Sequence, residues 1–217
     1  MRAQLRPALV ALGLFTLLTG LVYPLVVTGI AQVVFPWQAN GSLIVQRGQP
    51  VGSALLGQPF DDPKYFWGRP SATSPAYNAA SSSGSNLGPT NKVLIDTVAN
   101  RVKALHEVDS NNTASIPVDL VTASGSGIDP HVSPAAALYQ INRIAKSRGL
   151  KEEKVREIVQ YFTEDRPFGL FGQPRINVLQ LNLALDDYEK HPDMKFDKKD
   201  DSLSGPNRQL TTKVSIY

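Results

Sequence analysis

Residues able to do acid–base or nucleophilic chemistry are few and scattered in this chain of 217 residues. Its three histidines, His106, His131 and His191, stand far apart and lack the spacing of metal ligands. Ser124 and Ser126 lie in a glycine-rich stretch, where serine hydroxyls commonly bond to nearby backbone groups. A serine nucleophile also needs a base and an orienting group, and the sequence indicates neither. We interpret His106, in a predicted helix, as a surface residue.

Motifs of nucleotide-dependent and hydrolytic enzymes are absent as well. The sequence has no G-x-x-x-x-G-K-[ST] loop, no G-x-G-x-x-G turn after a strand and no G-x-S-x-G elbow around a nucleophilic serine. It also has no cysteine, which excludes disulfides, thiolate metal sites and a cysteine nucleophile. We therefore predict no catalytic residue, no metal site and no cofactor held by this chain itself.

The formal net charge of +3 gives little support to nucleic-acid binding. Two basic residues, Arg2 and Arg6, precede a long apolar stretch, and the remainder has 20 basic and 19 acidic residues. A nucleic-acid surface needs a basic patch or stripe, and none is present. We therefore expect no nucleic-acid partner.

The dominant feature is an uncharged stretch from Pro7 to Gln46, whose apolar centre is Ala8–Val34. As a helix this centre would be about 40 Å long, enough to cross a hydrocarbon core of roughly 30 Å. No other stretch approaches this length of hydrophobicity. We predict a short cytoplasmic segment at residues 1–7 and one transmembrane helix at residues 8–34.

The flanking charges predict how the helix is oriented. Arg2 and Arg6 lie just before the apolar stretch, and the next basic residue is Arg47. Because basic flanks tend to stay in the cytoplasm, residues from about Phe35 onward are expected outside. The alternative, a cleaved signal peptide, has an apolar region of roughly 7–15 residues that ends in a small-x-small site. This stretch is longer and has no clear Ala-x-Ala site, which favours an uncleaved anchor.

Some residues of the predicted span bear on function. Pro24 removes a backbone donor and should kink or divide the helix. Gly13, Thr16 and Gly20 recur at spacings of three and four, a pattern of small residues that lets membrane helices pack closely. We predict that they contact a partner helix, although such residues are also ordinary components of membrane helices. Phe35–Trp37 suit the outer interface with lipid headgroups.

Residues 35–191 are expected to form a single extracytoplasmic α+β domain. Residues 42–46 and 51–57 stand on either side of a turn at 47–50, which predicts two strands joined by a turn. A short strand is predicted at 117–122. Apolar periodicity and capping residues predict helices at 91–108, 133–148, 151–164 and 177–188, the last with a strand as the alternative.

Two segments have the composition of irregular structure. Residues 68–90 are dominated by Ser, Ala, Pro, Gly and Asn, and so long a loop is usually functional or mobile. A flexible linker is the alternative. Residues 192–217 are polar with mixed charge, and we predict a disordered tail.

Considered together, these segments resemble the C subunit of the Kdp potassium-transporting P-type ATPase of bacteria. No single motif would suffice, but the matches occur in register along nearly the whole chain from residue 5 to about 190. The tail from Pro192 departs from the family pattern. The matching stretches are Leu5–Pro7, Phe35–Leu43, Gly52–Gln58, Phe66–Ala72, Gly84–Leu87, Leu120–Gly127, Gly172–Leu179 and Leu183–Asp186.

The resemblance implies an accessory subunit in a complex with a potassium-binding, channel-like subunit and an ATP-hydrolysing P-type subunit. ATP and potassium ion are then ligands of the complex. Members of the family are described as assembly or catalytic-chaperone subunits that raise the ATP affinity of the hydrolysing partner, which implies nucleotide binding. A domain outside the membrane would not reach a cytoplasmic nucleotide site, so such an effect should travel through the membrane helices.

The predicted contact residues lie in two places, besides the surrounding lipid. The membrane face consists of Gly13, Thr16 and Gly20, and the external loops contribute Arg69, Ser85 and Asn86. A free-standing anchored receptor or sensor domain is the main alternative function, and an anchored hydrolase is the next.

Overall fold

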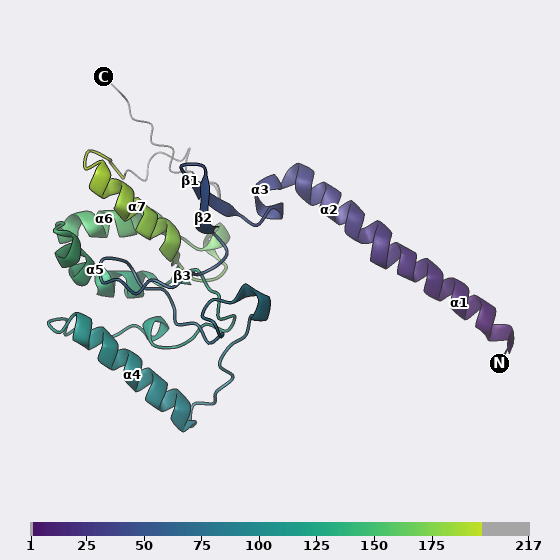
Figure 1. Cartoon of the computed structure of the whole chain (residues 1–217), viewed down its shortest axis with the longest axis horizontal. Helices are drawn as coiled ribbons and strands as arrows, with labels where there is room; N and C mark the ends of the chain where they lie inside the picture. Colours follow the sequence, from purple (N-terminus) through teal and green to yellow (C-terminus); the bar gives the residue numbers. More distant parts are fainter. Residues whose placement is uncertain (1, 197–217) are drawn as a thin grey trace, which may run out of the picture. The chain divides into compact units, whose positions relative to one another are not determined.

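A computed structural model describes residues 2–196 of the chain, with only the backbone of Arg2. The chain divides into two compact units, residues 1–43 and 44–217. Figure 1 follows the elements from the N-terminus onward. The first unit contains α1 (Arg2–Leu17), the π-helical turn η1 (Leu18–Val22), α2 (Tyr23–Val34) and α3 (Pro36–Ala39).

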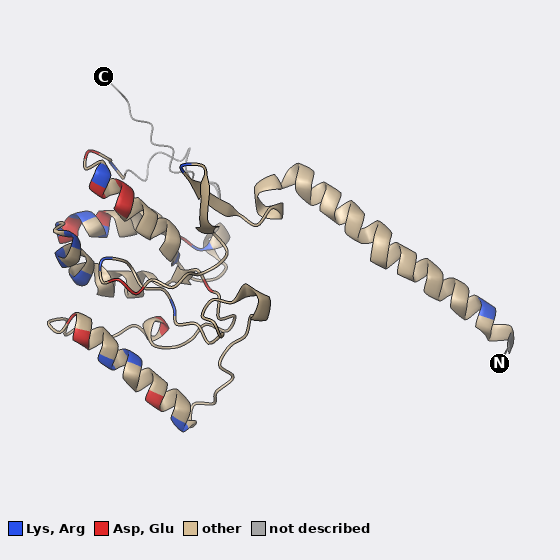
Figure 2. Cartoon of the chain, viewed as in Figure 1, with Lys and Arg blue, Asp and Glu red and all other residues tan. Residues whose placement is uncertain are grey.

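The N-terminal elements form one continuous helix that is long and apolar enough to cross a membrane. An 18-residue window within Ala3–Val34 has a mean hydropathy of 2.2, and none of that window is buried in the described structure. Figure 2 shows the helix without charged side chains beyond Arg6. The predicted disturbance at Pro24 takes the form of the π turn that precedes it, in which Tyr23 N–H bonds to Leu18 O. The wider turn accommodates a residue whose ring would otherwise clash with the preceding turn.

The second unit begins with the predicted hairpin. Strands β1 (Leu43–Gln46) and β2 (Gln49–Ser53) form a two-stranded sheet. Arg47 and Gly48 connect them with φ values of 50° and 77°. Two positive φ values match the type I′ turn, whose twist suits a tight hairpin.

The core of the domain lies between three helices and a small sheet. The helices are α5 (Pro134–Arg148), α6 (Glu152–Phe162) and α7 (Val178–Lys190), which Figure 1 shows grouped together. The antiparallel sheet has the order β3-β5-β4, formed by His131–Val132, Arg175–Asn177 and Thr163–Glu164. This mixture of helices and sheet confirms the predicted α+β class.

Local sequence signals set the ends of these helices. Ser133 caps α5 by accepting a hydrogen bond from Ala136 N at 3.1 Å, and Gly149 ends it with a φ of 66°. Asn177 caps α7 by accepting from Gln180 N at 3.1 Å. Apolar residues of all three helices are buried, including Ile141, Ile144, Val155, Ile158, Leu181 and Leu185.

The remaining predictions of elements are partly confirmed. The predicted helix at 91–108 is α4 (Lys92–Val108), although Leu105 is its one buried residue. Residues 117–122 were predicted as a strand, but Val118–Leu120 form the 3-10 turn η3. The prediction was wrong because Pro117, followed by a carboxylate at Asp119 that bonds to Ser133, favours a turn over a strand edge. The remaining 3-10 turns are η2 (Ala79–Ser81) and η4 (Pro167–Gly169).

The start of the predicted tail packs against the domain. The ring of Phe196 lies 5.5 Å from that of Tyr161 and 6.1 Å from that of Tyr188, measured between centroids. Residues 197–217 of the predicted tail lie outside the described residues.

Candidate functional site

A segment from Pro63 to Trp67 fixes the position of the loop that follows it, residues 68–90. Phe66 is fully buried, and its backbone bonds to Asn182 of α7 at 2.8 Å and 3.0 Å. Trp67 N donates to Gln140 Oε1 of α5 at 2.8 Å, and the guanidinium of Arg143 lies 4.3 Å from the Trp67 ring centre. This segment holds the chain against two helices immediately before Arg69.

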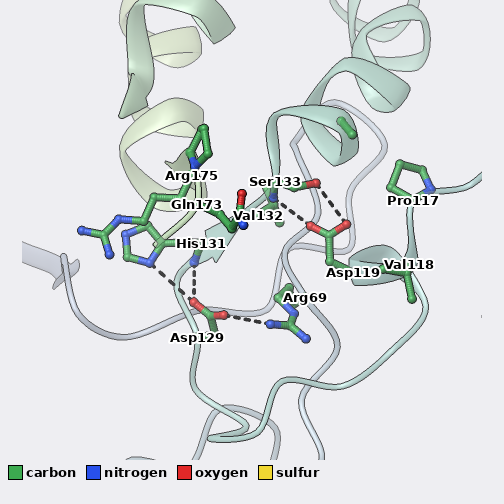
Figure 3. A pocket seen from close by; sticks show the side chains of 12 residues that line it. Arg69, Pro117, Val118, Asp119, Asp129, His131, Val132, Ser133, Gln173 and Arg175 are labelled. Atoms are coloured by element: carbon green, nitrogen blue, oxygen red, sulfur yellow. Dashed lines mark hydrogen bonds and ion pairs between the residues drawn. The ribbon is translucent and has the colours of Figure 1, made fainter. Parts of the chain in front are cut away.

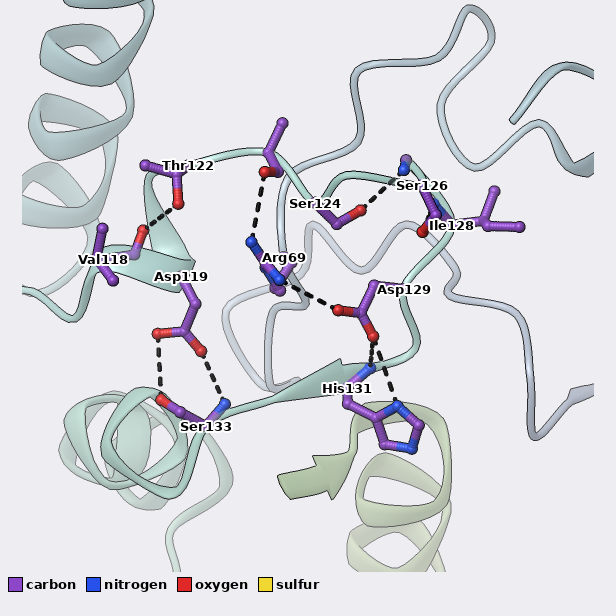
Figure 4. A network of polar contacts seen from close by, with 12 residues as sticks. Arg69, Val118, Asp119, Thr122, Ser124, Ser126, Ile128, Asp129, His131 and Ser133 are labelled. Carbon is purple, nitrogen blue, oxygen red and sulfur yellow. Dashed lines mark hydrogen bonds and ion pairs between the residues drawn. The ribbon is translucent and has the colours of Figure 1, made fainter. Parts of the chain in front are cut away.

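Arg69 joins the loop 68–90 to the turn 123–131. Its Nη1 lies 3.3 Å from Asp129 Oδ2, and its Nη2 donates to Ala123 O at 3.4 Å. Asp129 Oδ1 accepts from His131 N at 3.0 Å and lies 3.5 Å from His131 Nδ1 (Figure 4). Asp129 therefore connects an arginine of one loop to the first residue of β3.

The electrostatics of this network keep Asp129 ionised. Burial of its carboxyl group opposes ionisation, but hydrogen bonds from the side chain and backbone of His131 favour the charged form. The charges of His131 and Arg69 act in the same direction, and the pKa of Asp129 is lowered from its ordinary value. The carboxylate thus serves as a charged connection between the two segments.

Further hydrogen bonds hold the rest of the loop against the same turn. Ser71 Oγ donates to Gly127 O at 2.6 Å and accepts from Tyr77 N at 2.9 Å. Ser82 Oγ donates to Ser126 O at 2.9 Å. These contacts favour a fixed loop over the flexible linker that the composition left open.

The close packing of backbone explains the glycines of the turn. A Cβ atom at Gly127 would lie 2.6 Å from Thr73 Cγ2 and 2.7 Å from Ser83 O, and its φ is 69°. At Gly84 a Cβ would lie 3.0 Å from Gly125 O. Gly127 therefore needs glycine for the two segments to approach each other, and at Gly84 a side chain would fit only if the neighbouring backbone moved slightly.

A pocket of about 630 Å³, lined by both polar and apolar residues, opens beside this network (Figure 3). Asp119 accepts hydrogen bonds from Ser133 N at 2.7 Å and Ser133 Oγ at 3.1 Å, and Arg175 pairs with Glu164 at 3.1 Å. Among the residues that line the pocket, one buried side-chain atom, Nε of Arg69, has no hydrogen-bond partner in the described structure. The pocket is lined by Arg69, Pro117, Val118, Asp119, Asp129, His131, Val132, Ser133, Ala135, Gln173, Pro174 and Arg175.

The geometry gives the pocket no arrangement for nucleophilic catalysis. Ser124 Oγ accepts from Gly127 N at 2.9 Å and Ser126 Oγ from Ile128 N at 3.3 Å, as the sequence interpretation expected. His131 faces Asp129, and Ser133 is bonded to Asp119. Residues 2–196 contain no group of three or more His, Asp or Glu side chains suited to a metal ion. The polar groups therefore stabilise the loops or contact another molecule.

The predicted contact residues are distributed over both units. Ser85 and Asn86 are exposed, and Asn86 has a φ of 52°. Gly13 and Gly20 have open space where a side chain would project, and Thr16 is exposed beside them. Their roles as contacts remain predictions. Arg69 has in addition the structural role described above, with its side chain 28% exposed.

Sequence reasoning missed two features of the domain. The pairing of Asp129 with Arg69 joins residues sixty positions apart, and no local spacing signals it. The apolar residues Phe168, Leu170 and Phe171 are exposed in the loop between β4 and β5. The sequence could have indicated this exposed loop, since its large apolar residues lie among glycines and prolines, which favour irregular structure at a surface.

Comparison with known proteins identifies the family. Residues 5–187 match the family described as the c chain of the K⁺-transporting ATPase, KdpC. The potassium-transporting ATPase KdpC subunit of Methylococcus capsulatus is 59% identical over 182 residues, which are 83% of this chain and 96% of the relative. That of Sorangium cellulosum is 60% identical over 187 residues, 86% of this chain and 98% of the relative. The chain belongs to the KdpC family of potassium-transporting ATPase subunits.

Proposed function

We propose that this chain is the accessory, non-catalytic subunit through which a potassium-import ATPase complex is assembled in the inner membrane. Its partners are a potassium-binding, channel-like subunit and an ATP-hydrolysing P-type subunit. The observation that carries the proposal is the helix Ala3–Val34, which is apolar and has no buried residue within the described chain. A free-standing receptor or sensor has less support, because the relatives are named as ATPase subunits.

We assign the contact within the membrane to the face of Gly13, Thr16 and Gly20. A Cβ at either glycine would meet no atom of the described chain within 4 Å, so the space is open to a neighbouring helix. Without a hydrophobic driving force in lipid, small residues favour association by letting two backbones approach closely. The external loops with Arg69, Ser85 and Asn86 provide the second contact.

The proposed orientation places the N-terminus in the cytoplasm and the domain outside, because Arg2 and Arg6 are the basic flank of the span. With the domain outside, an increase in ATP affinity would reach the hydrolysing subunit through packed membrane helices. The proposal therefore includes the catalytic-chaperone role without contact between this chain and ATP.

Substitution of Gly20 tests the proposed assembly. Gly20→Leu keeps the span apolar but prevents close approach, at a cost on the order of 1–2 kcal/mol. The variant should reach the membrane normally, co-purify poorly with the transport subunits, and raise the ATP concentration for half-maximal hydrolysis in the remaining complex. Gly29→Leu, also in open space, serves as the matched control. If Gly20→Leu assembles as well as the parent, the membrane face is not the contact.

Orientation is tested by single cysteines, since the parent chain has none. Ala104 is exposed on α4, and Ala3 is exposed at the start of the helix. In intact spheroplasts a membrane-impermeant maleimide should label Ala104→Cys and leave Ala3→Cys unlabelled. The reverse pattern would place the domain in the cytoplasm and refute the proposed topology.

A further inference from the structure

The π turn before Pro24 leaves one backbone carbonyl of the membrane helix without a backbone donor. A helical carbonyl accepts from the N–H four residues on, or five residues on where the helix widens to a π turn. For Thr19 the first of these donors is Tyr23, but the Tyr23 N–H bonds to Leu18 O. The second is Pro24, which has no N–H. The carbonyl of Thr19 is therefore left open.

Nearby side chains of the same helix do not supply the missing donor. The hydroxyl of Thr19 itself donates to Phe15 O at 2.6 Å. Thr16 leans toward the N-terminus, as helical side chains do, and so away from this carbonyl. Tyr23 carries its hydroxyl at the far end of a rigid ring and is 64% exposed. Thr28 lies nine residues beyond Thr19, about 13 Å along the axis. A donor must therefore come from outside the described helix.

Thr19 lies deep in the predicted span, where lipid tails offer no donor. It follows Ala8 by eleven residues and precedes Val34 by fifteen, about 16 Å and 22 Å along a helix axis. An open carbonyl is costly in hydrocarbon, and membrane helices tolerate proline where a neighbouring helix bonds to the freed groups. The approach is clear, because a Cβ at the adjacent Gly20 would meet no atom within 4 Å.

We propose that Thr19 O accepts a hydrogen bond from the side chain of a partner transmembrane helix, a hydroxyl or a carboxamide. This contact rests on the proposed function and gives the chemistry of the partner at the face that contains Thr16 and Gly20. Thr16 is three positions before Thr19 and Gly20 is next to it, so the carbonyl borders that face. The small residues let the two backbones approach, and the hydrogen bond fixes the height and rotation of the partner helix. The partner therefore carries a Ser, Thr, Asn or Gln near the middle of the bilayer.

Selective isotope labelling of the full chain tests the proposal. The sequence contains only two Thr-Gly pairs, which begin at Thr19 and at Thr28. With carbon-13 at the threonine carbonyls and nitrogen-15 at the glycines, magic-angle-spinning NMR filtered for directly bonded labels detects these two carbonyls alone. Thr28→Ser removes the second pair and so assigns the signals. The carbonyl of Thr28 is the matched reference, because α2 continues past its helical donor at Gln32.

The carbonyl chemical shift reports the hydrogen bond. In bilayers that contain this chain alone, the Thr19 signal should lie upfield of the Thr28 signal. In the intact transporter it should move downfield to the position of the Thr28 signal, which itself stays in place. A Thr19 signal that remains upfield in the intact transporter would overturn the proposal. Polarisation transfer from water to this carbonyl would also overturn it, because water would then be the donor.

Pro24→Ala tests whether the carbonyl is open in the parent chain. The alanine restores an N–H at residue 24, so the helix can return to α geometry and the Tyr23 N–H can bond to Thr19 O. In bilayers of the variant alone, the Thr19 signal should move downfield without any partner. An unchanged signal would show that Thr19 O already has a donor in the parent chain, which would refute the proposed contact.

Co-purification of the labelled chain with the transport subunits separates this contact from the proposed function. A chain that co-purifies while its Thr19 signal does not move refutes the partner donor and leaves the proposed assembly intact. A chain that co-purifies with no transport subunit refutes the proposed function, and the partner donor with it.

Discussion

Residues 68–90 and residues 166–174 each contain only one short 3-10 turn, yet different forces act on them. The first loop is rich in Ser, Gly and Asn, and its hydroxyl groups bond to the turn 123–131. The second has Phe168 and Phe171 at its surface, with exposures of 96% and 62%. Composition alone suggests the reverse, with the polar loop free and the apolar loop buried.

The comparison shows that a loop on the surface of a small domain is held in place by hydrogen bonds rather than by its hydrophobicity. Buried backbone groups need partners, and short hydroxyl side chains supply them at close range. The polar loop meets this requirement with Ser71, whose Oγ contacts the backbone of Gly127 and of Tyr77. The apolar loop lies outside the core, which leaves its side chains available to another surface.

Among substitutions in the loops, the largest effect is expected from a side chain at Gly127. In Gly127→Ala, the new Cβ would meet Thr73 and Ser83 at 2.6 Å and 2.7 Å, at a φ of 69°. We expect a loss on the order of 1–3 kcal/mol in the free energy of unfolding, measured by urea denaturation of the chain in detergent. Gly125→Ala in the same turn is the control, because its Cβ meets nothing within 4 Å. Equal losses would mean that the two loops are not packed as described.

Loss of the Ser71 hydroxyl should have the next largest effect. Ser71→Ala removes the donor to Gly127 O and the acceptor for Tyr77 N, which are bonded at 2.6 Å and 2.9 Å. The half-buried backbone groups would lose their partners, at a cost of about 1–2 kcal/mol in the same denaturation experiment. Ser82→Ala removes an exposed bond to Ser126 O and should change stability by no more than about 0.5 kcal/mol. A neutral Ser71→Ala would show that the hydroxyl does not order the loop.

Acid should weaken the connection made by Asp129. Its pKa is lowered in the folded protein from the ordinary value of 3.8, so its stabilising effect is complete above that pH. The effect is lost as pH falls from about 4 through the lower folded pKa. Asp129→Asn does not titrate, so the stability advantage of the parent over this variant should shrink across that interval. Denaturation at several pH values measures it, and a constant difference would contradict the assignment.

The helices of the domain were predictable because their signals are local. Ser133 and Gly149 mark the two ends of α5, and the apolar period of α6 matches its buried residues. The 3-10 turn at Val118–Leu120 was missed because Asp119 is satisfied by Ser133, fourteen positions away. Such a partner does not show in the pattern of neighbouring residues.

The candidate site was predictable only in part, because composition is a local signal and contacts between distant segments are not. The Gly- and Ser-rich composition of 68–90 and 123–127 indicated function or mobility, but not that the two segments contact each other. That contact depends on Arg69, Asp129 and the close backbone approach at Gly127. For Gly13, Thr16 and Gly20 the argument still rests on the sequence pattern, since their proposed partner is another chain.

The smallest effect on stability is expected in the apolar loop, at its most exposed residue. Phe168→Ser removes a ring that is 96% exposed, so the free energy of unfolding in detergent should change by no more than about 0.5 kcal/mol. Phe162→Ala, a few residues earlier and 3% exposed, should cost about 3–5 kcal/mol. A large loss from Phe168→Ser would mean that the ring packs within the domain.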